Sequence, residues 1–178
     1  MTSVYFTFQT IRALGQTYAA RIGPPDECTS ALGHVAVGFS WLEQSLERHI
    51  ATLAQAPSAI APALTAELSY KMKVAVLSSL VRAQPSLRAF NVGSENPEEV
   101  WSDIVKMLSA CEDFRNQLLH SHWQPLPGGD RIRRTKTTAK AARGVRVVTE
   151  DLTADYLLDV YDFILNVEWA LNEFFHDA

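Results

Sequence analysis

The sequence is poor in cysteine, with only Cys28 and Cys111 among its 178 residues. Their positions match neither the spacing of a zinc site nor that of a redox pair. We therefore expect two reduced, buried thiols, with a disulfide between them as the alternative. Hydrophobic runs are short, because none approaches the roughly 18–20 apolar residues that a membrane-spanning helix needs. The first residues also lack the basic leader and apolar block of a secretory signal. These absences predict a soluble, cytoplasmic protein.

Motifs of several enzyme classes are missing too. The sequence has no glycine-rich phosphate loop, nucleophile elbow, zinc-ligand spacing or kinase-like set of residues, which disfavours those hydrolases and transferases. His120-Ser121-His122 suggests a metal site, but residues two apart on a helix diverge by about 200°, so chelation would require a strand or a loop. We therefore expect no metal and no cofactor.

The acidic and basic residues are unevenly distributed along the chain. The formal net charge is −4, yet seven of the 16 basic residues fall in one stretch without an acidic residue. The stretch contains Arg131, Arg133, Arg134, Lys136, Lys140, Arg143 and Arg146. The first six are the candidate RNA-binding residues, because each phosphate contact adds affinity that depends on salt. The alternative is a solvated hairpin whose charges prevent edge-to-edge pairing.

Four stretches carry apolar residues at steps of three and four, which indicates amphipathic helices. They span roughly residues 29–55, 63–82, 97–123 and 153–175. Asn96 and Pro97 predict the start of the third helix, and Thr153 caps the fourth. Before the first helix, residues 1–25 predict either a short packed helix or a partly ordered tail.

Residues 131–138 and 145–149 alternate and are rich in β-branched side chains, with Gly144 before the second run, which favours a β-hairpin or an arm. The predicted fold is therefore all-α. It is an antiparallel four-helix bundle in a single domain of residues 1–178. The bundle carries the N-terminal segment 1–25 and the basic hairpin or arm at 130–150.

The third helix ends in the sequence RNQLLHSHW, in which Arg115 precedes His120 by five positions and Asn116 follows the arginine. An arginine and a histidine at such a spacing arise about once by chance in a chain of this composition, so the context matters more than the pair. A polar residue follows the arginine, a small residue follows the histidine, and the motif closes the penultimate helix. In these features the chain resembles the HEPN family of RNA-cutting and RNA-binding helical bundles.

The resemblance implies a metal-independent endoribonuclease that acts as a homodimer, with two motifs facing each other along the third and fourth helices. His120 is then the general acid or base, Arg115 stabilises negative charge on the phosphate, and Asn116 orients the histidine or the phosphate. Related proteins act as toxins or defence effectors, so an antitoxin-like protein partner is expected. The alternative is a non-catalytic HEPN-like bundle that binds RNA or protein, and a chance match of the motif is a third possibility.

The position of Arg115 beside the apolar stripe of its helix requires a partner for its guanidinium group. Glu43, between Leu42 and Leu46 in the first helix, is the candidate. A structural Glu43–Arg115 ion pair is the alternative to a purely catalytic role, and it is compatible with a site that the pair holds in place.

Overall fold

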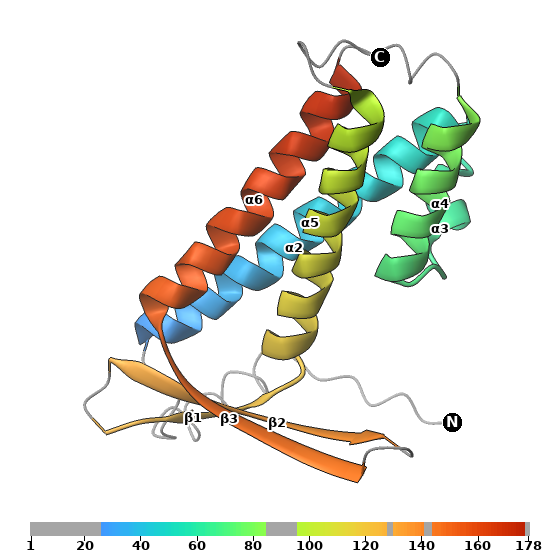
Figure 1. The fold of residues 1–178 in the computed structure, drawn as a ribbon. Helices are drawn as coiled ribbons and strands as arrows, with labels where there is room; N and C mark the ends of the chain where they lie inside the picture. Colours follow the sequence, from blue (N-terminus) through green and yellow to red (C-terminus); the bar gives the residue numbers. More distant parts are fainter. Residues whose placement is uncertain (1–25, 85–95, 128–129, 141–143, 177–178) are drawn as a thin grey trace, which may run out of the picture.

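The computed structural model describes residues 26–84, 96–127, 130–140 and 144–176 (Figure 1). The predicted N-terminal segment 1–25 lies outside the described residues. The helices are α2 (Asp26–Leu53), α3 (Ala61–Thr65), α4 (Tyr70–Ala83), α5 (Pro97–Leu118) and α6 (Ala154–His176). The strands are β1 (His122–Pro125), β2 (Arg131–Lys140) and β3 (Gly144–Thr153).

The fold is mixed, so the predicted all-α class is wrong. The three strands form one antiparallel sheet in the order β1-β2-β3, which lies across one end of the helices (Figure 1). β2 and β3 pair along their whole length, as the alternating pattern of the hairpin indicated. β1 comes from His122–Pro125, a segment that the helical prediction had partly absorbed into the third helix. That helix ends at Leu118 instead of continuing to Trp123.

The helices also run in directions that the predicted antiparallel bundle did not have. Residue numbers rise in the same direction along α2 and along each of the helices it contacts. Toward α4, Phe39 contacts Tyr70 and Leu53 contacts Gln84. Toward α6, His34 contacts Tyr161 and His49 contacts Asn172. Contacts between α5 and α6 run in opposite order, from Trp101 with Phe174 to Phe114 with Phe163. α2, α4 and α6 are therefore parallel to one another, and α5 is antiparallel to them. Because α2 and α4 are parallel, the chain must run back from the end of α2 to the start of α4, and α3 lies on this return path. A sequence pattern of four long helices gives no indication of such a return.

Local capping residues explain most of the helix boundaries. The side chain of Asn96 accepts a hydrogen bond from the Glu98 amide at 3.1 Å, as expected for the start of α5. Thr153 caps α6 in the same way, accepting from the Tyr156 amide at 3.2 Å. The predicted second helix is divided into α3 and α4, because Ser69 begins a new helix by accepting from the Met72 amide.

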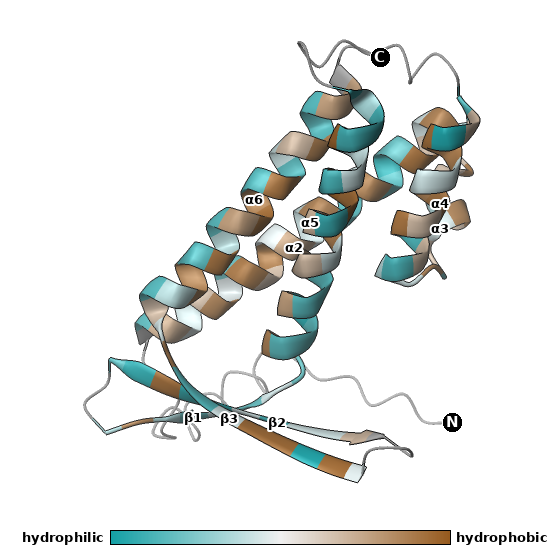
Figure 2. Ribbon diagram, viewed as in Figure 1, coloured by the Kyte–Doolittle hydropathy of each residue, from teal (hydrophilic) through white to brown (hydrophobic). Residues whose placement is uncertain are grey.

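The core joins the helices to the sheet. Fully buried apolar side chains come from every long helix and from β2, and they include Leu42, Leu46, Leu77, Leu108, Ile132, Ile164 and Leu171. Figure 2 shows the alternation of polar and apolar residues along each helix that produces this arrangement. Burying each such side chain stabilises the fold by about 1.5–3 kcal/mol before entropy is considered. None of the helices in the described residues is long and apolar enough to cross a membrane.

Both cysteines are buried and free, as predicted. Cys28 lies on α2 and Cys111 on α5. Burial raises the pKa of the Cys111 thiol to about 12, so this group is a protonated packing residue at neutral pH.

Candidate functional site

The HEPN-like motif lies where α5 meets the sheet. Arg115 and Asn116 are half-buried in the last turn of α5, whereas His120 is exposed in the turn that follows. The Leu119 amide still donates to the Arg115 carbonyl at 2.8 Å, but the helix does not continue beyond it. The predicted helix to Trp123 would have included His120, but His120 lies in the turn beyond the end of α5. The shorter helix instead places the histidine in solvent.

Arg115 reaches across the bundle from α5 to α2. Its guanidinium carbon lies 4.9 Å from the centre of the Phe39 ring, a cation–π contact. Within the described residues no carboxylate lies within ion-pair distance of this guanidinium. Its N–H groups are therefore not committed to an acidic side chain of the described segments.

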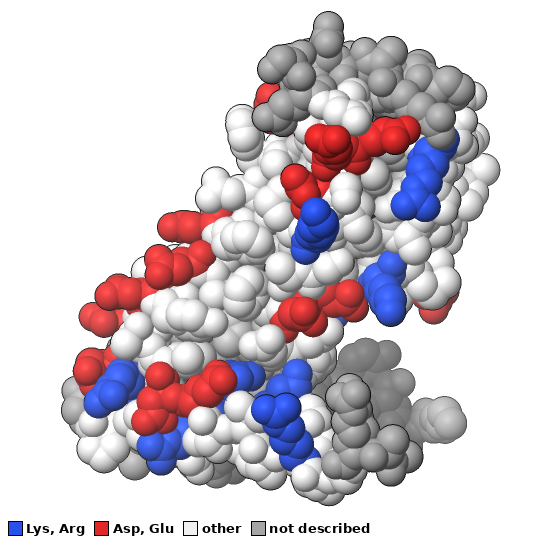
Figure 3. All heavy atoms as spheres, viewed as in Figure 1, with Lys and Arg blue, Asp and Glu red and all other residues white. Residues whose placement is uncertain are grey.

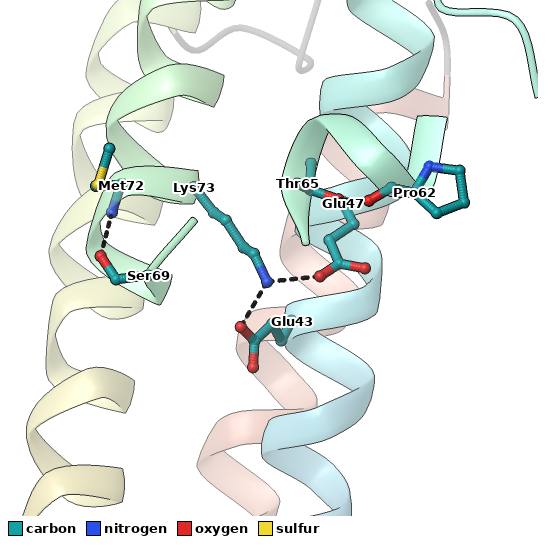
Figure 4. Close-up of polar contacts among 7 residues, drawn as sticks. All are labelled: Glu43, Glu47, Pro62, Thr65, Ser69, Met72 and Lys73. Carbon is teal, nitrogen blue, oxygen red and sulfur yellow. Dashed lines mark hydrogen bonds and ion pairs between the residues drawn. The ribbon is translucent and has the colours of Figure 1, made fainter. Parts of the chain in front are cut away.

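Glu43 does not form the predicted ion pair with Arg115. It accepts a hydrogen bond from the Lys73 ammonium group at 2.7 Å, and Glu47 accepts a second at 2.5 Å (Figure 4). The reason is geometric: Glu43 and Glu47 are one turn apart on α2, and both reach the long side chain of Lys73 on α4. Burial of Lys73 favours the neutral amine, but the bonds and charges of the two carboxylates outweigh it and raise the pKa of Lys73.

Side chains of the sheet cap the C-terminal end of α5. Lys136 donates to the Asn116 carbonyl at 2.5 Å, and Arg134 donates to the Gln117 carbonyl at 3.0 Å. The Trp123 indole donates to the Leu118 carbonyl at 3.1 Å. These carbonyls have no partner within the helix, and two cations at this end also complement the helix dipole. The sheet thereby holds in place the turn that carries the motif.

Arg134 is the central residue of this junction. It is only 3% exposed, and its second guanidinium nitrogen bonds to the Glu150 carboxylate at 2.6 Å. Its Nε atom is buried without a partner. Register places Trp123 and Glu150 on either side of Arg134, on the same face of the sheet. Arg134 therefore acts as a buried connection between helix and sheet, and its charge is not presented to solvent.

The other predicted RNA-binding residues have different surroundings. Arg133 forms two hydrogen bonds to the Asp151 carboxylate, at 2.7 and 2.9 Å. These bonds raise the pKa of Arg133 and lower that of Asp151. Arg131 is exposed, 3.8 Å from the carboxylate of Asp130. The Lys140 side chain and Arg143 lie outside the described residues. Because β3 supplies acidic partners to β2, the basic stretch is more neutral in three dimensions than in sequence.

A polar network between α2 and α6 was not found by sequence reasoning. Ser45 donates to the Glu168 carboxylate at 2.6 Å, and Asn172 accepts from Arg48 at 2.7 Å and bonds to the His49 ring at 2.9 Å. The serine proton points to a carboxylate instead of a histidine, so the group is not a nucleophile with its base. Its members belong to helices more than a hundred residues apart, and no local pattern connects them.

A cavity of about 420 Å³ lies near the opposite end of α5, between α4 and α6. Its apolar lining includes Val81, Trp101, Val105 and Phe174. Trp101 is fourteen residues from Arg115, about 20 Å along the helix, so the cavity is separate from the motif.

No cluster of three metal-ligating side chains occurs in the described parts of the chain. His120 and His122 lie in the turn and in β1, respectively. Comparison of the chain with family models, with curated proteins and with solved structures found no match.

Proposed function

We propose that this protein is a HEPN-like, metal-independent endoribonuclease that acts as a cytoplasmic homodimer. The observation that carries the proposal is the placement of His120, an exposed imidazole directly after a helix end that the sheet holds fixed. An imidazole titrates near neutral pH and can exchange a proton with RNA. Arg115, five residues earlier in the last turn of α5, has a guanidinium group without an acidic partner among the described residues.

The reaction is an in-line attack of a ribose 2′-hydroxyl on the adjacent phosphorus. The new P–O2′ bond forms as the P–O5′ bond breaks, leaving a 2′,3′-cyclic phosphate and a 5′-hydroxyl. Neutral His120 of one subunit accepts the 2′ proton, and protonated His120 of the second donates one to the leaving oxygen. Arg115 stabilises the charge on the non-bridging oxygens. Asn116 orients the histidine or the phosphate.

The test is cleavage of RNA by purified protein in EDTA, with the ends of the products analysed. We expect cyclic phosphate ends from the parent protein and loss of at least about a hundredfold in rate for His120→Ala. His122→Ala is the matched control, because His122 is also exposed and lies only two residues away. Cleavage that survives in His120→Ala, or that disappears equally in His122→Ala, would exclude His120 as the acid–base residue.

A second candidate function is a non-catalytic HEPN-like module that binds RNA or a protein. The contact of Arg115 with Phe39 favours it, because this contact directs the guanidinium group toward the bundle. An inactive but folded protein in the cleavage test would select this candidate. In the catalytic case we propose a toxin or defence effector with an antitoxin-like protein partner.

A further inference from the structure

Two neighbouring helices carry large apolar side chains in solvent on the same side of the molecule. Val37 and Trp41 on α2 are 46% and 49% exposed, and Leu158 and Trp169 on α6 are 37% and 63% exposed. Val37 and Trp41 are one turn apart, and Leu158 and Trp169 are three turns apart, so each pair shares one face of its helix. We call these four residues the α2–α6 strip. Tryptophan is enriched among the residues that contribute most to protein–protein binding, and apolar patches rimmed by polar residues mark interaction sites.

The α2–α6 strip lies along a tightly packed seam. A Cβ atom at Gly38 of α2 would lie 2.9 Å from the side chain of Tyr161 on α6. Further along, Ser45 and Glu168 form the hydrogen bond described above. Trp41 lies between these two contacts along α2, and Trp169 follows Glu168 on α6. The helices that carry the two tryptophans are therefore fixed relative to each other, so a partner can bind both side chains without a rearrangement of α2 and α6.

Acidic residues border the α2–α6 strip on one side. Asp155, Asp159 and Asp162 are exposed on α6. They lie next to Leu158 and Trp169, on the side of these two residues that is farther from α2. Figure 3 shows acidic side chains along the outer side of this helix. The border on α2 has no acidic residue: it consists of exposed Ser40 and Gln44 and, one turn further, of Arg48, whose guanidinium group bonds to Asn172 of α6. The surface therefore combines an apolar centre with negative charge along one edge.

We infer that the α2–α6 strip is the docking site for a cationic amphipathic helix of another protein. The apolar face of such a helix covers the two tryptophans, and basic residues along one of its edges meet the aspartates of α6. The acidic border repels RNA. It also disfavours binding of a second copy of this chain at the same surface, because that copy would add an identical row of negative charges. The inference does not depend on Arg115 or His120, so it can fail or hold independently of the proposed ribonuclease activity.

The probe is a synthetic helical peptide of about five turns, with leucines on one face and lysines along its edges. Its affinity for the full chain is measured by fluorescence anisotropy, beside a peptide in which every lysine is replaced by glutamate. We expect the cationic peptide to bind at least about tenfold more tightly than the acidic one. Trp41→Ser and Trp169→Ser should each weaken binding about tenfold or more. Because both side chains are exposed, neither variant should lose its helical circular dichroism signal.

Matched variants distinguish docking at the α2–α6 strip from nonspecific binding of the peptide to the protein. Met72→Ser removes a side chain that is 52% exposed on α4 and should leave binding unchanged. Asp155→Asn, Asp159→Asn and Asp162→Asn together should weaken binding and flatten its salt dependence. The same number of exposed acids removed from α5, with Glu99→Gln, Asp103→Asn and Asp113→Asn, should not. Equal binding of both peptides, or binding that survives both tryptophan changes, would overturn the inference. So would self-association of the free protein that requires Trp41 and Trp169.

Discussion

The ammonium group of Lys73 shows how a single buried charge fixes two helices. It bonds to Glu43 and Glu47, and its side chain is only 6% exposed. Replacing it by methionine leaves two carboxylates one turn apart without a cation. We expect Lys73→Met to lower the free energy of unfolding by about 2 kcal/mol, less than for a fully buried pair because both glutamates are partly exposed. Urea unfolding at neutral pH measures this change.

The same lysine gives the stability a dependence on alkaline pH. Its pKa is raised above 10.5 in the folded protein. Its contribution is therefore complete below that pH and decreases as the pH rises through the folded pKa. In Lys73→Met this part of the alkaline slope should be missing. An unchanged slope above pH 10.5 would assign the loss of stability to other groups.

His49 makes the stability depend on pH in the acidic range. Burial lowers its pKa from the usual 6.5, despite the hydrogen bond between its Nε2 atom and the accepting Oδ1 atom of Asn172, and its ring stacks on Phe175 at 4.3 Å. Folding therefore favours the neutral ring, and stability should fall as the pH drops below 6.5 because the unfolded chain binds the proton more readily. We expect His49→Gln to reduce the difference in Tm between pH 7.5 and pH 5.5, as calorimetry can measure.

The predicted partner of Arg115 was wrong, although its place beside an apolar stripe was recognised. The sequence places Arg115 beside an apolar stripe, and a guanidinium group in contact with an aromatic ring agrees with that position. The expected partner Glu43 instead binds a lysine that is 30 residues away in the chain. Hydrogen-bond partners between helices depend on relative rotation, which a periodic pattern does not contain.

At the scale of elements, the α2–α6 seam depends on one missing side chain. Gly38 faces the Tyr161 ring so closely that a Cβ atom would lie 2.9 Å from it, whereas a Cβ at Gly33 meets nothing within 4 Å. Alanine stabilises an exposed helical position by about 1 kcal/mol relative to glycine. Gly33→Ala should therefore stabilise α2, and Gly38→Ala should destabilise the protein in spite of the same helical gain.

A double mutant tests whether the Tyr161 ring is the reason that Gly38→Ala destabilises the protein. When Tyr161 is replaced by alanine the obstruction is removed, and Gly38→Ala should become stabilising in that background. Thermal unfolding of the two single variants and the double variant gives the coupling. Additive effects would show that the ring does not limit the approach of the helices.

The elements themselves follow local rules that the sequence displays. The long helices were found because apolar residues at steps of three and four, together with the caps at Asn96 and Thr153, are encoded within each segment. β1 was missed because His122–Pro125 is only four residues long, too few for its alternation to be recognised beside the helical pattern that precedes it; it becomes a strand by pairing with β2. α3 was merged with α4 because five residues are too few to show a helical period.

For the whole molecule, the direction of the helices and the attachment of the sheet could not be derived from local patterns. Both depend on contacts between distant segments, such as Arg134 with the α5 carbonyl of Gln117 and with Glu150. This junction makes the sheet part of the cooperative fold. Without it, β2 and β3 would be largely a hairpin, and isolated hairpins are marginally stable in water.

We therefore expect backbone amides of β2 and α5 to exchange with solvent in one unfolding event, as native-state hydrogen exchange can measure. Arg134→Met removes the hydrogen bonds to the Glu150 carboxylate and to the Gln117 carbonyl, which keeps its bond from the Ser121 hydroxyl, and it should lower global stability by about 2–4 kcal/mol. It should also let the sheet open at a lower free energy than the bundle. Arg131→Met, at an exposed position of the same strand, should change stability by less than about 0.5 kcal/mol. Exchange of β2 that is already independent of α5 in the parent protein would contradict the role of Arg134 as the connection between helix and sheet.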